Sequence, residues 1–287
     1  MTLRSFRFPN KGLLVWSDTD WLRSILPSDS RKKKLLRRLG GLPILSRRFN
    51  GKVPFGDRIY DLDRILAQFA DIAPFSKVSA IFVNSRRNLP RIYVWLQSEG
   101  HPMFLKIGGP TELPAFENEA NALTELHTGN DLIVMHPLSL RVYDSLVLLL
   151  SQGMSLTMHQ QKQRLSPDEV LSYFVKLGVK ANGFFGGPVH GDLSSHNAFD
   201  VEGRLLVVDW ESAAPHGPDY CDLIELCSTL LVADCTRPTG LAALKAQVRR
   251  SADLELDEVT LRNALKFLAQ HGSINSQKIL NSTNKSN

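Results

Sequence analysis

The amino-acid sequence predicts an α+β fold in which a lobe built on an antiparallel β-sheet, with one main helix, precedes a mostly helical lobe. Between residues 76 and 151, short runs rich in β-branched and aromatic residues alternate with turn-forming segments. One stretch of helical period, residues 112–127, interrupts these runs, and helical periodicity prevails from residue 152 onward. Strands and helices that occupy separate parts of a chain are typical of the α+β class.

The β-rich part begins with three runs that are expected to form a meander of adjacent strands. Turn residues separate these runs at 84–90 and 97–102. The helix that follows carries Leu113, Phe116 and Ala120 on one stripe, which is the pattern of a helix with one buried face. The predicted strands are 78–83, 91–96, 103–107, 132–142 and 146–150.

The second part of the chain has the signals of a helical lobe that contains one short hairpin. Residues 166–169, Ser-Pro-Asp-Glu, form a capping box with proline at the first helical position, which marks the start of a helix. Two short strands, 197–201 and 205–208, are expected to pair across Glu202 and Gly203. The remainder, 218–270, is helical in period.

The composition is that of an ordinary globular protein. With 287 residues, the chain has room for one large domain or for two lobes. Hydrophobic residues make up 43% and charged residues 22% of the chain, which excludes wholesale disorder. The longest apolar runs, such as Leu146 to Leu150, have the length of a strand and are too short to span a bilayer. Residues 1–10 lack the apolar stretch of a secretory signal.

The cysteines indicate a reducing environment. Cys221, Cys227 and Cys235 are odd in number, lack C-x-x-C spacing and have no paired histidines beside them. Such a set is typical of packed, reduced thiols rather than of a disulfide framework or a metal site. Together with the absence of a signal sequence, this predicts a cytoplasmic protein.

The chain is expected to begin with an accessory helical and basic segment at 1–75. The β-rich lobe at 76–151, the helical lobe at 152–280 and a flexible tail at 281–287 follow it. Lysine and arginine are concentrated from Arg31 to Arg38, as a solvated helix face or as a weak contact with an anionic membrane surface. The aromatic residues are scattered rather than interleaved with basic ones, so no nucleic-acid partner is expected.

The strongest functional signal is His-Gly-Asp-Leu-Ser-Ser-His-Asn at residues 190–197, followed by Val-Val-Asp-Trp-Glu at 207–211. Phosphoryl transfer requires an acceptor hydroxyl held in line and divalent ions that neutralise the phosphate oxygens. Asp192 suits the first task, because a carboxylate on a loop can orient a hydroxyl and accept its proton. Asn197 and Asp209 suit the second task, because Mg²⁺ prefers a few protein oxygens together with waters and phosphates.

These motifs resemble those of the aminoglycoside phosphotransferase family, and the Asp-Trp-Glu sequence at 209–211 is similar to its choline and thiamine kinase-like branches. The resemblance covers residues 76–270 approximately. It implies the protein-kinase-like two-lobe fold, ATP with Mg²⁺ as cofactors, and a small hydroxyl-bearing acceptor as partner. It also implies that Asp192 is the catalytic base and that Asn197 and Asp209 are the metal ligands.

The β-rich lobe offers two further matches to the family. Lys106, in Phe-Leu-Lys-Ile at 104–107, resembles the third-strand lysine that contacts the α- and β-phosphates. Glu119 aligns best with the glutamate that pairs with this lysine, and Glu117 is the alternative. From the residues alone, Lys106 can equally be a strand-edge lysine that faces water, and Glu119 part of a polar helix face.

The segment expected to cover the phosphates departs from the family pattern. Residues 84–90, Asn-Ser-Arg-Arg-Asn-Leu-Pro, contain no glycine, although backbone amides approach phosphate most closely where no Cβ intervenes. Related small-molecule kinases often have a serine or asparagine in this loop, so Ser85 is the residue expected to bind the nucleotide there. Arg86 and Arg87 would add positive charge.

Three other residues near the motifs have secondary roles by the same resemblance. Asp222 matches a family aspartate that braces the catalytic loop, which is a structural role. His196 replaces the small residues often seen at its position and is a candidate to line the acceptor site. Glu211 is either a ligand of a second metal or of a cationic acceptor, or an exposed turn carboxylate.

Three functional hypotheses are therefore considered. The first is an ATP-dependent phosphotransferase that acts on a hydroxyl of a sugar, an amino-alcohol or a similar small molecule. The second is a catalytically silent pseudokinase that works as a binding or scaffold module, which the glycine-free loop suggests. The third is a membrane-surface kinase that acts on a lipid-linked or polysaccharide headgroup. The complete set of Asp192, Asn197 and Asp209 favours the first.

Overall fold

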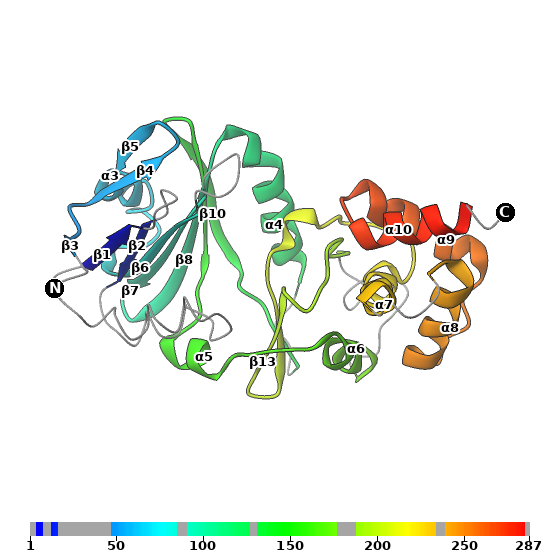
Figure 1. Cartoon of the computed structure of the whole chain (residues 1–287). Helices are drawn as coiled ribbons and strands as arrows, with labels where there is room; N and C mark the ends of the chain where they lie inside the picture. The colour runs from blue at the N-terminus through cyan, green and yellow to red at the C-terminus, as the bar shows by residue number, and fades with distance from the viewer. Residues whose placement is uncertain are drawn as a thin grey trace. The chain divides into compact units, whose positions relative to one another are not determined.

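The computed structural model describes residues 4–7, 13–16, 47–84, 91–126, 131–176, 188–233 and 239–284. The chain divides into two compact units, each made of two segments (Figure 1). The first unit comprises Met1–Phe116 and Met135–Gln161, and the second comprises Glu117–Val134 and Lys162–Asn287. An antiparallel sheet dominates the first unit and helices prevail in the second, which confirms the predicted α+β fold class.

The first unit is built on an eight-stranded sheet with the order β10-β11-β8-β7-β6-β2-β1-β3. Every neighbouring pair in this sheet is antiparallel. The meander predicted from the alternation of strand and turn residues forms its centre. The strands are β1 (Arg4–Arg7), β2 (Leu13–Trp16), β3 (Arg47–Arg48), β6 (Phe75–Asn84), β7 (Arg91–Ser98), β8 (His101–Gly108), β10 (Pro137–Tyr143) and β11 (Leu146–Gln152).

One face of this sheet carries the core of the first unit. The register pairs Ile81 with Val94 and Val94 with Leu105, so that buried side chains line up across the three central strands. Leu150 continues the row on β11, opposite Leu105. Side chains alternate between the two faces of a strand, so Lys106 lies on the face opposite to that of Leu105.

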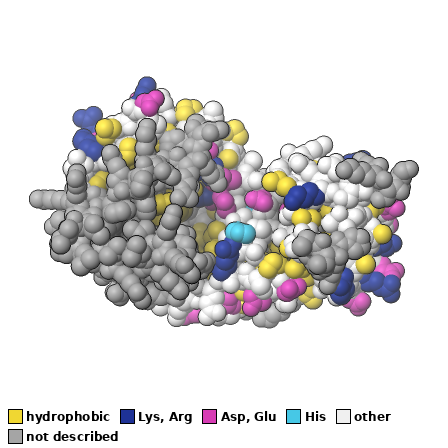
Figure 2. Space-filling view, viewed as in Figure 1, with side chains coloured by type: hydrophobic (Ala, Val, Ile, Leu, Met, Phe, Trp, Pro, Cys, Tyr) yellow, Lys and Arg dark blue, Asp and Glu magenta, His cyan; other side chains and the backbone are white. Residues whose placement is uncertain are grey.

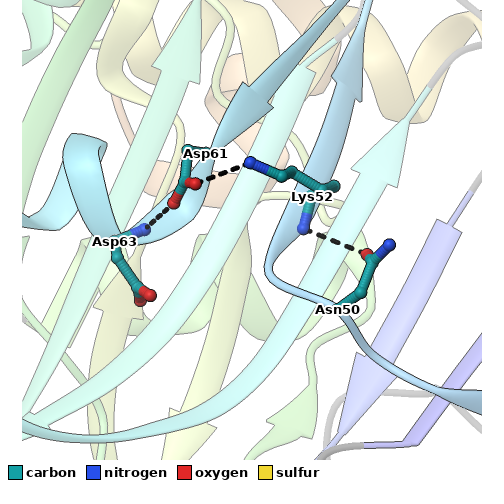
Figure 3. A network of polar contacts seen from close by, with 4 residues as sticks. All are labelled: Asn50, Lys52, Asp61 and Asp63. Carbon is teal, nitrogen blue, oxygen red and sulfur yellow. Dashed lines mark hydrogen bonds and ion pairs between the residues drawn. The ribbon is translucent and has the colours of Figure 1, made fainter.

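A two-stranded hairpin and a short helix belong to the same unit. The hairpin consists of β4 (Lys52–Phe55) and β5 (Arg58–Asp61), and α3 (Leu62–Ala67) follows it at once. Asp61 ends the hairpin and begins the helix: its carboxylate binds Lys52 Nζ at 2.7 Å and accepts the backbone N–H of Asp63 at 3.1 Å (Figure 3). The second bond satisfies one of the free N–H groups at the helix N-terminus.

The units do not follow the predicted boundaries. Residues 1–75 were expected to be a separate helical segment, but β2 pairs with β6 in the register Leu14 to Phe82, and β1 and β3 extend the same sheet. The Leu-Leu-Val-Trp run of β2 does not alternate, so its local pattern gives no sign of the strand that it joins. The predicted basic stretch Arg31 to Arg38 lies outside the described residues, as does the tail from residue 285.

The predicted strand 132–142 is divided between the two units. β9 (Leu132–Ile133) pairs in parallel with β14 (Arg204–Val207) in the second unit, whereas β10 pairs with β11 in the first. The interruption precedes Pro137, which has no backbone N–H for a continuous strand ladder. The sequence pattern is apolar on both sides of the interruption, so it did not reveal the change of sheet.

An ion pair holds the segment that connects β8 to helix α4. Arg91 of β7 makes a buried ion pair with Glu112 in the short 3-10 helix η2 (Pro110–Glu112). The same guanidinium lies 5.8 Å from the ring centroid of Phe116. Helix α4 (Leu113–Glu125) starts here, and its later part belongs to the second unit.

The second unit combines a small sheet with a set of helices. The sheet has the order β12-β13-β14-β9. The capping box predicted at the start of α6 is confirmed, since Ser166 and Glu169 exchange hydrogen bonds of 2.7 and 3.3 Å. The further elements of the chain are α5 (Leu156–Gln161), β12 (Gln163–Arg164), α6 (Pro167–Lys176), β13 (Ala198–Val201), η4 (Trp210–Ser212), α7 (Cys221–Ala233), α8 (Leu241–Ala252), α9 (Glu258–Gln270) and α10 (Ile274–Asn284), of which α5 lies in the first unit.

Helix α7 is the centre of the helical unit. Its first eight residues, 221–228, are all buried, and the apolar ones among them, except Leu226, pack with apolar residues of α8, α9 and α10. Cys221 and Cys227 are free and buried, which confirms the expectation of packed thiols for these two, and Cys235 lies outside the described residues. Figure 2 shows side chains of both charge signs beside one another over the C-terminal helices, where pairs such as Arg262 and Glu258, 2.7 Å apart, occur.

In the part of the chain that the structure describes, no helix combines the length and the apolar character needed to cross a membrane.

Candidate active site

The three residues of the predicted catalytic set lie in the second unit, around one hairpin. Asn197 directly precedes β13, and Asp209 follows β14 by two residues. The two strands pair in the register Ala198 to Val207, and the N–H of Val208 donates to the carbonyl of Asn197 at 2.9 Å. An antiparallel hairpin therefore brings the end of the 190–197 motif next to the start of Asp-Trp-Glu.

Asn197 closes the loop that carries Asp192. Its side-chain Nδ2 donates to the carbonyl oxygen of Asp192 at 3.0 Å, and its backbone N–H donates to the carbonyl of Ser194 at 3.0 Å. The first bond uses the nitrogen end of the amide. The carbonyl oxygen Oδ1 of Asn197 points away from the carbonyl of Asp192 and is the end of the amide that can bind a hard cation.

Asp209 stands in an unusual backbone conformation. It has φ 67° and ψ 55°, in the left-handed region, and it precedes the short helix η4. Aspartate and asparagine tolerate this conformation better than most residues because their short polar side chains can bond locally. Such a turn directly after a strand reorients the carboxylate, and single left-handed residues of this kind are concentrated at functional sites.

The residue after Asp209 anchors this turn. Trp210 is buried, its indole N–H donates to the carbonyl of Val207 at 3.1 Å, and its ring lies 4.7 Å from that of His190. Buried tryptophan generally needs a partner for its N–H, and Val207 supplies it here. The turn at Asp209 is thereby fixed from its C-terminal side.

His190 connects the loop to the strand that leads to Asp209. The imidazole is fully buried; its Nε2 lies 3.1 Å from the carbonyl of Val208, and its Nδ1 accepts the N–H of Asp192 at 3.3 Å. A ring nitrogen that accepts a hydrogen bond carries no proton, so the neutral tautomer with the proton on Nε2 satisfies both contacts. The imidazole thus joins the two halves of the motif.

Asp222, at the start of α7, binds the backbone of the loop, as predicted. Its two carboxylate oxygens accept the backbone N–H groups of His190 and Gly191 at 3.0 and 3.1 Å. The side chain is 2% exposed. Burial raises its pKa to about 7, and this effect exceeds that of the two hydrogen bonds, which lower the pKa. One carboxylate therefore satisfies two backbone donors at the turn into Asp192.

Gly191 is required at this turn for two reasons. Its φ is +78°, in the region that favours glycine, and a Cβ at this position would lie 2.4 Å from the carbonyl oxygen of Ser212. The loop therefore approaches the backbone at the last residue of η4 as closely as a residue without a side chain allows.

The electrostatics of the loop suit a proton acceptor beside a cation site. Burial raises the pKa of Asp192, the negative charge of Asp209 raises it further, and His196 opposes this shift. The repulsion between two such carboxylates decreases when a cation binds near both of them. Among the described residues, no group of three or more His, Cys, Asp or Glu side chains could hold a metal, so any cation here would depend on Asn197, Asp209 and non-protein ligands.

The residues predicted to bind the nucleotide lie in different units. Lys106 is on β8 of the first unit and is 8% exposed, and Glu119 is on α4 in the second unit and is 6% exposed. Both side chains are too buried to lie on a water-facing strand edge or helix face. Glu117 is exposed, so Glu119 is the better candidate of the two glutamates. Their pairing stays a prediction. Ser85 lies outside the described residues.

Two features of the site were not predicted from the sequence. Arg164 of β12 donates from Nε to the carbonyl of Ser195 in the loop, at 3.0 Å. Glu225, one turn after Asp222 on α7, accepts the hydroxyls of Ser273 and Ser276 at 2.7 and 3.0 Å. An arginine in a short exposed run and a glutamate in an apolar helix carry no local signal of these partners.

No protein-family model and no curated protein matches the chain. Among solved structures, a thermostable mutant of aminoglycoside phosphotransferase APH(4)-Ia in ternary complex with ADP and hygromycin B is 11% identical, with a TM-score of 0.44, over 77% of this chain and 97% of that chain. The crystal structure of aminoglycoside phosphotransferase APH(4)-Ia is 12% identical, with a TM-score of 0.43, over 77% of this chain and 98% of that chain. A likeness at this level is too low to establish a function.

Proposed function

We propose that this chain is an ATP-dependent phosphotransferase that moves the γ-phosphate to a hydroxyl of a small molecule. One observation carries the proposal: Asp192, Asn197 and Asp209 meet at one hairpin and loop, whose backbone is held by His190 and Asp222. Phosphoryl transfer depends on positioning and on charge neutralisation more than on covalent help from the protein. A rigid loop that presents one base beside two oxygen ligands meets that requirement.

The proposed reaction assigns the proton to Asp192. The acceptor oxygen forms a bond to the γ-phosphorus, the bond between this phosphorus and the bridging oxygen to the β-phosphate breaks, and ADP leaves. The hydroxyl proton passes to the carboxylate of Asp192, whose pKa is raised above its ordinary value, which favours acceptance of a proton. Hydrogen bonds to the side chains of His190 and Asn197 hold the backbone of Asp192 in place.

The donor set fits Mg²⁺. Asn197 offers a carbonyl oxygen and Asp209 a carboxylate, and Mg²⁺ is usually bound through one or two protein oxygens, waters and substrate phosphates. When bound, the ion would neutralise charge on the phosphate oxygens. Asn197 and Asp209 would hold it, and the left-handed turn at Asp209 would aim the carboxylate.

The nucleotide is assigned to Lys106, Glu119 and Ser85, and this assignment rests on the sequence resemblance together with burial. A buried lysine on a strand is costly unless a counter-charge accompanies it, and ATP phosphates would provide one for Lys106. A cytoplasmic location agrees with the free thiols of Cys221 and Cys227.

The test is a thermal-shift titration with ATP and Mg²⁺ together with an assay of ADP formation, wild type beside Asp209→Asn. A ligand that binds only the native state adds about 2.7 kcal/mol of stability at a hundredfold excess over its dissociation constant. We expect a Mg²⁺-dependent shift in the wild type that is lost in the variant, with loss of turnover. Asparagine keeps the left-handed turn, so the variant should fold.

Asp253 provides the matched control, because it is an exposed aspartate with φ 54° outside the site. Asp253→Asn should leave both the thermal shift and the turnover unchanged. Full turnover in Asp209→Asn would contradict the metal assignment. A nucleotide shift without turnover on any acceptor would favour the catalytically silent alternative instead.

A further inference from the structure

The short strand β12 lies beside β13, the strand that follows the loop of Asp192, and so far only the contact of its Arg164 with the loop has been described. β12 pairs with β13 in the register Gln163 to Asp200 and Arg164 to Phe199. The N–H of Leu165 then donates to the carbonyl of Ala198 at 3.3 Å. The segment therefore lies directly beside the strand that leaves the loop of Asp192.

Arg164 reaches from this strand to the loop. Its Nε donates to the carbonyl of Ser195 at 3.0 Å, three residues after Asp192, and the side chain is exposed. Among the described residues, no carboxylate pairs with its guanidinium. One N–H thus holds the arginine against the loop, while the Nη1 and Nη2 groups remain for an oxyanion, which guanidinium binds with two parallel hydrogen bonds.

Lys162 lies on the same side of the strand, two residues earlier. Its Nζ is 5.1 Å from the ring centroid of Phe199, the residue opposite Arg164 in the register, and it is half-buried. Burial alone lowers its pKa, with no charged group contributing to the shift. Among the residues described, no carboxylate pairs with this ammonium, and its contact with the Phe199 ring compensates only part of its desolvation.

The nearby carboxylates are engaged with other groups. Asp200 accepts the hydroxyl of Tyr173 and the N–H of Gly203, the latter at 3.2 Å. Glu169 accepts the N–H and the hydroxyl of Ser166, each at 2.7 Å. Asp200 and Glu169 therefore have partners other than Arg164 and Lys162, and the remaining carboxylates described at this loop are Asp192 and Asp209 of the proposed site itself.

We propose that Arg164 and Lys162 form an anion-recognition site beside the catalytic loop, and that the acceptor is a small hydroxyl compound with a carboxylate or phosphate group. The proposal rests on the proposed function and names the class of its acceptor. Two cations beside the loop would repel a polyamine sugar and attract an acidic one. Arg164 would bind the anionic group while Asp192 orients the hydroxyl.

The first experiment measures ADP formation with four related acceptors: glucose, glucosamine, gluconate and glucose 6-phosphate. We expect kcat/KM for gluconate or glucose 6-phosphate to exceed that for glucose by about tenfold or more, with glucosamine lowest, as expected for a charge-assisted hydrogen bond. The two anionic sugars distinguish a carboxylate from a phosphate. Equal use of all four, or a preference for glucosamine, would overturn the proposal.

The variants are Arg164→Gln and Lys162→Gln, with Arg250→Gln on α8 as the control for loss of one exposed positive charge. We expect the KM for the anionic acceptor to rise about 10- to 100-fold in Arg164→Gln, with the KM for ATP unchanged. The control should match the wild type. A uniform fall in kcat for every acceptor, with the preference retained, would mean that Arg164 only holds the loop, and would contradict anion recognition.

Direct binding separates this inference from the kinase proposal. Isothermal titration of gluconate and glucose 6-phosphate into the full chain without nucleotide should show binding that Arg164→Gln and Lys162→Gln weaken, even if no turnover occurs. Binding of neither anion, or equal binding by the wild type and both variants, would refute the site. Loss of the Mg·ATP thermal shift with anion binding intact would instead refute the phosphotransferase.

Discussion

Gly191 shows how a single residue determines the shape of the loop. Its positive φ, the Ser212 carbonyl 2.4 Å from the place of a Cβ and the hydrogen bond to Asp222 coincide at one position. Gly203, in the β-turn between β13 and β14, has the same φ of +78° but no atom within 4 Å of a Cβ. A comparison of alanine substitutions at the two glycines therefore separates the free-energy cost of backbone strain from that of steric contact.

Gly191→Ala is expected to destabilise the protein by about 2–4 kcal/mol, because a left-handed alanine costs about 1–2 kcal/mol and the contact with Ser212 adds to it. Gly203→Ala should cost only the strain, about 1–2 kcal/mol. Urea denaturation of both variants measures the difference. Equal losses would show that the loop near Gly191 relaxes without cost.

At the scale of elements, α7 connects the catalytic loop to the C-terminal helices. Asp222 and Glu225 are one turn apart on this helix, so both project from the same side of it. Asp222 accepts N–H groups of the loop, and Glu225 accepts the hydroxyls of Ser273 and Ser276 at the start of α10. Two buried carboxylates thus hold two separate segments to one helix.

Glu225→Ala is expected to cost about 2–3 kcal/mol, since it leaves the buried hydroxyls of Ser273 and Ser276 without an acceptor. Hydrogen exchange should accelerate first in α10. The control is Glu258→Ala on α9, whose exposed pair with Arg262 should contribute under about 0.5 kcal/mol. Unchanged protection of α10 in Glu225→Ala would contradict this role.

Asp222 should make the stability depend on pH. Burial raises its folded-state pKa from 3.8 to about 7, so between these values the folded state binds the proton more tightly than the unfolded state does. The free energy of unfolding contributed by this group is therefore greatest below pH 3.8 and declines as the pH rises toward 7.

Asp222→Asn removes this titration, although it also replaces one acceptor oxygen by an amide donor that faces backbone N–H groups. The variant should be less stable throughout, and its stability should fall less than that of the wild type between about pH 4 and 7. Urea denaturation at several pH values gives both curves. Parallel curves would show that Asp222 does not titrate in this range.

At the scale of the molecule, the two compact units have separate hydrophobic cores. The first core includes Ile81, Leu105 and Leu148 of the large sheet. The second unit has one cluster around β13 and β14 and another around α7, α8 and α9, to which Leu265 belongs. We therefore expect a loss of packing to act first within the unit in which it occurs.

Leu105→Ala and Leu265→Ala each remove a fully buried side chain and should each cost about 2–5 kcal/mol within their own unit. Hydrogen exchange read peptide by peptide should accelerate in β6–β8 for the first variant and in α7–α9 for the second. The same acceleration of both units in both variants would contradict separate cores and indicate a single cooperative fold.

The sequence by itself determined most of the local elements and the loop and hairpin on which the proposed site is built. The central strands, α4, the capping box at Ser166 and the hairpin after Asn197 follow from periodicity and turn residues, because each depends on neighbours within about ten positions. The motif at 190–197 located the loop, and the antiparallel hairpin brings Asn197 close to Asp209 as the spacing predicts.

The tertiary structure alone decided which distant segments meet. β2 joins β6, β9 leaves its predicted strand for β14, Arg164 holds Ser195 and Glu225 holds the start of α10. Arg164 and Ser195 are 31 positions apart in the sequence, and Glu225 and Ser273 are 48 positions apart. The free energy of these contacts depends on chain closure and on shared burial, and neither leaves a mark in the local pattern of residues.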